Sequence, residues 1–93
     1  MGRQSLAQQI FEEYKETPPG ENTWLIIYDF PGTKPTGKFY DNLNRITSYS
    51  TDGQLIQYSV YMTRDQRAAK SIQDLVKHYD GMVMKFKAEL VEE

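Results

Sequence analysis

The segment WLIIYDF, residues 24–30, decides how the rest of the chain is interpreted. Every residue in it except Asp29 is apolar or aromatic, and turn-forming residues stand on both sides. An unbroken apolar run of this length is typical of a strand that is buried on both faces, whereas a half-exposed strand alternates. We therefore predict that residues 24–30 form a central strand of a sheet.

The residues after this strand come close to a nucleotide-binding motif. Gly32 to Lys38 spells G-x-x-x-x-G-K, but Phe39 stands where a P-loop has the Ser or Thr that binds magnesium, and Pro35 removes an N–H from the loop. The remaining segments also do not supply the parallel sheet of a P-loop enzyme. We interpret residues 31–37 as a turn into a helix at 38–47, with weak anion binding at the helix start as the alternative.

Downstream, the pattern predicts a hairpin, a helix and a last strand. Residues 46–63 contain two runs of strand-forming residues joined at Asp52-Gly53, a dipeptide that tolerates a tight turn. Thr63 to Gln66 matches a capping box, and the helix that it opens ends at Asp80-Gly81, where glycine is expected to supply a left-handed cap. Residues 82–90 alternate apolar and charged residues, which is typical of an edge strand with Lys85 and Lys87 on its outer side.

An N-terminal helix completes the element order. Apolar residues at helical spacing predict a helix from Leu6 to about Lys15, and the prolines at 18 and 19 end it, so residues 1–22 form a helix with a Pro/Gly linker. Residues 23–93 then follow the order βαββαβ. This order is typical of an α+β, ferredoxin-like sandwich, in which a four-stranded antiparallel sheet carries two helices on one face.

The other face of that sheet is predicted to be open. It carries Leu25, Ile27 and Asp29, or their alternates, from the first strand. From residues 54–63 it carries Leu55, Gln57 and Tyr61. Such a surface is too apolar to face only solvent, so we expect it to contact a second copy, a nucleic acid or the N-terminal helix.

Composition limits the classes of function. A chain of 93 residues holds one modest core, which favours a homodimer. The net charge of -2 gives no global positive field, so any site for DNA, RNA or another polyanion must be local. Cysteine is absent, which excludes disulfides and thiolate metal sites, and no segment resembles a signal peptide or a membrane span, so a cytoplasmic protein is expected.

Asp29 is the main candidate for chemistry. It ends an apolar strand, where a carboxylate must be solvated, hydrogen-bonded or metal-bound. Either Asp29 accepts N–H groups of the following loop, or it binds a divalent metal such as Mg²⁺ in a catalytic site. The residues alone leave both interpretations open.

Two segments resemble the CRISPR-associated protein two family. The strand end IIYDF matches through Tyr28 and Asp29, and residues 53–63, GQLIQYSVYMT, match a Gly-x-x-x-Gln-x-Ser-Val-Tyr pattern. The resemblance covers about residues 24–91 in the right order. It implies a ferredoxin-like homodimer that binds DNA as a bridge for an integrase partner, and in some members a Mg²⁺-dependent endonuclease.

The resemblance also implies roles for residues. By position, Asp29 is the implied metal ligand and catalytic residue. Lys34, Lys38 and Arg45 are the basic residues that follow it, and they are the candidates for nucleic-acid binding.

A non-catalytic role is the alternative. A ferredoxin-like module can bind another protein, or it can bind single-stranded RNA by stacking bases on strand aromatics. Tyr28 or Trp24, together with Tyr61, would form that platform. Residues 54–63 lack the glycine- and basic-rich pattern of RNA-binding strands, which favours core or dimer contacts for these rings.

Overall fold

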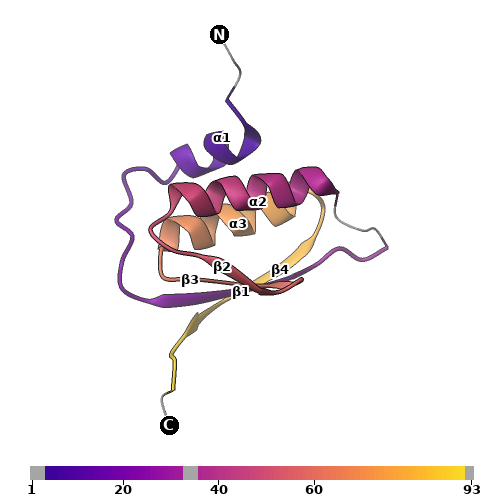
Figure 1. Ribbon diagram of the computed structural model, residues 1–93. Helices are drawn as coiled ribbons and strands as arrows, with labels where there is room; N and C mark the ends of the chain where they lie inside the picture. The colour runs from indigo at the N-terminus through magenta and orange to yellow at the C-terminus, as the bar shows by residue number, and fades with distance from the viewer. Residues whose placement is uncertain (1–3, 33–35, 92–93) are drawn as a thin grey trace.

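The computed structural model describes residues 4–32 and 36–91, which form a four-stranded antiparallel sheet and three helices (Figure 1). The protein is therefore of the α+β class, as predicted. In chain order the elements are α1 (Leu6–Glu12), β1 (Thr23–Asp29), α2 (Gly37–Tyr49), β2 (Gln54–Gln57), β3 (Val60–Thr63), α3 (Gln66–His78) and β4 (Met82–Ala88).

The strands lie in the order β2-β3-β1-β4. The apolar segment that we predicted to be central is β1, which pairs antiparallel with β3 on one side and with β4 on the other. Leu25 lies opposite Met62 of β3 and Phe86 of β4. The pairing confirms both the central position of β1 and the edge position of the last strand.

The predicted hairpin around Asp52-Gly53 is wrong. Helix α2 continues to Tyr49, and the ten-residue strand expected at 54–63 is divided into β2 and β3, which turn at Tyr58-Ser59. The apolar stripe of α2 explains the longer helix, because Ile46 is fully buried with Phe39 and Leu43 at helical spacing. Packing of this stripe outweighs the strand propensity of the residues after it.

All three helices lie on one side of the sheet (Figure 1). Helix α3 contacts β1, β3 and β4, helix α2 packs beside α3, and α1 packs on α2 and α3. The core between these layers holds the buried side chains, among them Ile26, Tyr28 and Tyr61 from the sheet. The N-terminal helix therefore does not cover the other face of the sheet, and the expectation that β1 is covered on both faces is wrong.

The end of α3 differs from the prediction by one residue. The left-handed residue is Asp80, with φ 61°, rather than Gly81. Gly81 is needed for a different reason, because a Cβ there would lie 2.6 Å from Cγ1 of Val76 and 2.8 Å from the Phe30 ring. The glycine thus allows β4 to start close against α3 and the end of β1.

Candidate functional site

The side of the sheet away from the helices carries two rows of apolar side chains. Strand pairing places one row across β3, β1 and β4 as Val60, Ile27 and Met84, and the next row as Met62, Leu25 and Phe86. We call these six side chains the bare face. Met84 and Phe86 are 57% and 45% exposed, and the four central side chains are half-buried. No helix of the described residues covers them (Figure 1).

Of the three residues predicted for this face from residues 54–63, only Gln57 lies on its side. Gln57 pairs with Val60, whereas Leu55 pairs with Tyr61, which is fully buried under the helices. The irregularity between Leu55 and Gln57 puts Gln57 on the opposite side from Leu55. Leu55 and Tyr61 still share a side, as they would in an unbroken strand, so they were misplaced because the helices cover the side of the strand that we predicted to be open.

The aromatic platform of the RNA-binding alternative is not present on the bare face, and Tyr28 and Tyr61 belong to the core, as the sequence pattern favoured. Tyr28 and Tyr61 are 3% and 0% exposed, and burial raises the pKa of both hydroxyls. Trp24 alternates with Leu25 and so lies on the helix side of β1, where Lys85 Nζ is 5.5 Å from its ring centre. Phe86 is the single aromatic side chain of the two rows.

Asp29 lies at a corner of the same side of the sheet. It is the last residue of β1, it is exposed, and it pairs with Met82 of β4. Its carboxylate has no hydrogen bond or ion pair within residues 4–32 and 36–91, and these residues contain no group of three or more His, Asp or Glu that could hold a metal ion. One carboxylate in one chain does not form a Mg²⁺ site by itself.

The basic residues proposed for nucleic-acid contact lie elsewhere. Lys38 and Arg45 are exposed on α2, where they border a shallow hollow together with Asn42, and Lys34 lies outside the described residues. Because α2 belongs to the helical layer, Lys38 and Arg45 lie on the opposite side of the sheet from Asp29 (Figure 1). The structure does not gather the predicted site residues into one place.

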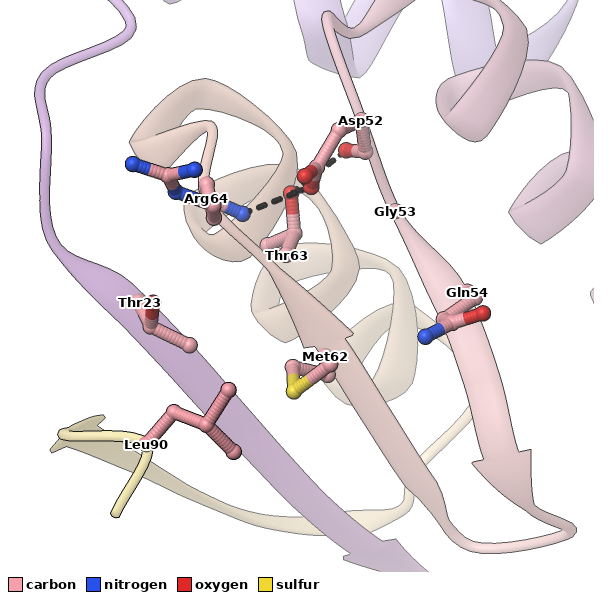
Figure 2. Close-up of a pocket in the computed structure, with 8 residues that line it drawn as sticks. All are labelled: Thr23, Asp52, Gly53, Gln54, Met62, Thr63, Arg64 and Leu90. Atoms are coloured by element: carbon pink, nitrogen blue, oxygen red, sulfur yellow. Dashed lines mark hydrogen bonds between the residues drawn. The ribbon is translucent and has the colours of Figure 1, made fainter. Parts of the chain in front are cut away.

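A hollow of about 470 Å³ opens at one end of the bare face (Figure 2). Met62 and Leu90 line its apolar part, and Asp52 and Arg64 stand at its polar rim. The rim is organised by Asp52, whose Oδ1 accepts the N–H of Arg64 at 2.8 Å and whose carbonyl accepts the hydroxyl of Thr63 at 2.6 Å. Asp52 therefore ties the start of β2 to the end of β3.

Next to this rim, a buried carboxylate begins α3. Asp65 is 0% exposed and accepts the N–H groups of Thr51 and Arg67, while the Arg67 guanidinium donates to both of its oxygens at 2.8 and 2.9 Å. Burial acts to raise the pKa of Asp65, but these hydrogen bonds outweigh it and hold the pKa below its ordinary value. The sequence pattern had indicated Thr63 as the cap, and the cap is Asp65. The network is satisfied internally, which indicates a structural role.

No family model matches this chain, and neither a curated protein nor a solved structure matches it. Within the described ranges, no helix has the length and apolar character needed to cross a membrane. The function is therefore argued from the bare face and from Asp29 at its corner.

Proposed function

We propose that this protein is a ferredoxin-like interaction module that forms a homodimer by packing the bare face against that of a second copy. The element order βαββαβ and the strand order β2-β3-β1-β4 support the ferredoxin-like assignment. The two uncovered apolar rows are the observation that carries the proposal. Two sheets that pack face to face form a core of this kind.

The size of the apolar surface supports an interface. Around the two rows, Met82 and Leu90 add side chains that are 66% and 79% exposed. Since a large apolar side chain offers roughly 200 Å² when extended, the exposed apolar surface here is on the order of 500 Å². That is at the upper end of what monomers leave uncovered, and a stable interface takes about 800 Å² from each partner, so polar side chains at the border would supply the rest.

The character of the face favours a second copy over a charged partner. A twofold dimer places the same patch against itself, which requires a patch free of like charges at its centre. The two rows contain no charged residue, and Asp29 is at the border. Lys85 and Lys87 alternate with Met84 and Phe86 and therefore point to the other side of the sheet.

Sedimentation of a double variant, Met84→Glu with Phe86→Glu, tests the dimer. Both side chains are about half exposed in the single chain, so the variant should fold, but two carboxylates within the interface would have to be desolvated. We expect the wild-type chain to sediment as a dimer and the variant as a monomer.

Tyr58→Ser provides the matched control, because Tyr58 is 85% exposed at the β2–β3 turn and outside the two rows. This variant should remain dimeric. A wild-type chain that sediments as a monomer at the highest concentration it tolerates would refute self-association, and dissociation by Tyr58→Ser would place the interface elsewhere.

A second candidate function rests on Asp29. We propose, following the resemblance to the CRISPR-associated protein two family, that the dimer acts on nucleic acid with Mg²⁺ and that Asp29 is its metal ligand. The supporting observation is that Asp29 is exposed on the side of the sheet that the dimer would use. Because one chain supplies one such carboxylate, the site would require Asp29 of both copies, and therefore a twofold axis that passes beside Asp29 rather than through the middle of the two rows.

Cleavage of labelled single- and double-stranded DNA and RNA in the presence of Mg²⁺ tests this second candidate. We expect activity that Asp29→Asn abolishes while sedimentation still reports a dimer. Equal cleavage by wild type and Asp29→Asn would exclude Asp29 from the reaction. No cleavage of any of these substrates would leave the interaction module as the function.

A further inference from the structure

Strand β4 is an edge of the sheet with a free side. It pairs with β1 alone, and in an edge strand every second residue directs its N–H and C=O away from the sheet. With seven residues and no proline, β4 is longer than the four-residue strand β2 at the opposite edge. It is therefore the edge better able to accept a further strand by backbone pairing.

The two sides of β4 differ sharply in character. Met82, Met84 and Phe86 project on the side of the bare face, whereas Lys85 and Lys87 project on the helix side. A strand added beside β4 would place its own side chains alternately on these two sides. Its side chains next to the methionines and Phe86 should be apolar, and those next to the lysines should be anionic.

Helix α3 adds charge on the lysine side. Lys70 and Lys77 lie two helical turns apart on α3, about 10.5 Å along its axis, and α3 packs against β4. Burial lowers the pKa of Lys85, and repulsion from Lys70 and Lys77 lowers it further, against the attraction of Asp74. The three ammonium groups therefore share one neighbourhood.

Within the described residues, no carboxylate lies within ion-pair distance of these lysines. The single ion pair there joins Arg67 to Asp65. Asp74, the carboxylate of α3 that attracts Lys85, accepts a hydrogen bond from the hydroxyl of Tyr14. The lysines along β4 and α3 are thus not held in ion pairs within the described residues, in a chain whose net charge is negative.

We propose that the free edge of β4 binds an extended segment of a partner protein in which acidic and apolar residues alternate. The segment adds as a fifth strand, its carboxylates facing Lys85 and Lys87 and its apolar side chains beside Met84 and Phe86. A second copy of β4 is a poor occupant, because symmetric pairing would bring lysines against lysines. The backbone edge of β4 is not part of the face-to-face dimer, although the apolar side chains of the segment would border that interface at Met84 and Phe86, so the proposal does not rest on the dimer.

The border of the site favours a short acidic peptide over a nucleic acid. Asp80 stands before β4 and Glu89 after it, and both are exposed. A phosphodiester chain that continued past either end would meet these carboxylates, whereas a segment of about the length of β4 ends before them. The unpaired backbone of the edge strand also matches a peptide, which can pair with it along its whole length.

An eight-residue peptide alternating glutamate and valine, with blocked ends, is the probe. Trp24 is the only tryptophan, it pairs with Lys87 and it lies under Lys85, so its fluorescence should respond to binding at this edge. We expect saturable binding that weakens as salt is added, together with slowed hydrogen exchange at the outward-facing amides of β4. The peptide with lysine in place of glutamate should not bind.

The double variant Lys85→Gln with Lys87→Gln should bind the acidic peptide roughly tenfold more weakly, since two charge contacts are lost. Lys38→Gln on α2 is the matched control and should bind like wild type. Equal binding of the acidic and basic peptides to wild type would overturn the proposal without reliance on any variant. It would also be overturned if a thymidine oligonucleotide displaced the peptide and bound more tightly, because the edge would then be a nucleic-acid site.

Discussion

Gly53 lies between α2 and β2, at a position where there is no room for a Cβ atom. A Cβ at this position would overlap the hydroxyl of Tyr61 and lie 2.9 Å from its Cζ. Tyr61 cannot move away freely, because it is fully buried and its hydroxyl is hydrogen-bonded to Thr47 Oγ1 at 2.7 Å. The glycine is required for close approach, not for an unusual backbone angle.

Gly53→Ala should therefore destabilise the protein. We expect the free energy of unfolding in urea to fall by about 2–3 kcal/mol, because the added methyl group overpacks a fixed ring. Gly37→Ala is the control, since nothing lies within 4 Å of its Cβ position and it begins α2. That variant should be neutral or more stable by up to about 1 kcal/mol. Equal unfolding curves for the two variants would contradict this account of Gly53.

At the scale of elements, Asp65 connects the start of α3 to the end of α2 through the N–H of Thr51. Asp65→Asn keeps a capping side chain but removes the charge that the Arg67 guanidinium neutralises. Because Arg67 would keep a largely buried charge without its partner, we expect the free energy of unfolding at neutral pH to fall by about 2–4 kcal/mol.

The pH dependence of that loss has a definite sign. The folded-state pKa of Asp65 lies below its unfolded value of 3.8, so its ionised form stabilises the fold at every pH above 3.8. The contribution is lost as the pH falls from 3.8 toward the folded-state pKa. Urea unfolding should give a constant difference between wild type and Asp65→Asn from about pH 7 to about pH 5, and a smaller one below 3.8. A difference that stays constant through the acid range would contradict this role of Asp65.

Elements whose apolar pattern was continuous could be predicted from the sequence. The central strand, both long helices and the edge strand follow from periodicity, and the structure confirms them. The turn at Tyr58-Ser59 could not be predicted, because it contains neither glycine nor proline and the flanking residues all favour strands. The division into two strands changes the side of Gln57 relative to Leu55, but it leaves Leu55 and Tyr61 on a common side. The bare face was expected, but Leu55 and Tyr61 were assigned to it in place of Val60 and Met62, because the strand pattern does not reveal which side the helices cover.

The candidate site was less predictable than the fold. Asp29 could be placed at the end of a strand from its apolar neighbours, and the structure puts it there. Its surroundings depend on which side of the sheet the helices cover, and an alternating strand such as β4 does not reveal this. The pattern of β4 suggested charges on the outside, whereas the structure leaves Met84 and Phe86 uncovered and turns Lys85 toward α3.

At the scale of the whole molecule, all helices lie on one side of the sheet, so the single chain buries only one of its two faces (Figure 1). A chain of this length hides little more than about 60% of its unfolded surface, so it gains much from covering the second face. Helix α1 adds to the covered side, where the backbone N–H of Ala7 is bonded to Asn42 at 3.0 Å. A second copy on the other side would cover the second face of β1, which is the environment that the sequence of β1 indicates.

The proposed dimer makes thermal stability depend on protein concentration. Because a native dimer unfolds to two chains, mass action stabilises it as concentration rises. A tenfold increase is worth about 1.4 kcal/mol per dimer, which for two chains of this length should raise the midpoint of thermal unfolding by about 3–4 °C. Calorimetry of wild type should show this shift, and Met84→Glu with Phe86→Glu should unfold at a lower midpoint that does not change with concentration. A concentration-independent midpoint for wild type would contradict the dimer even if both proteins fold normally.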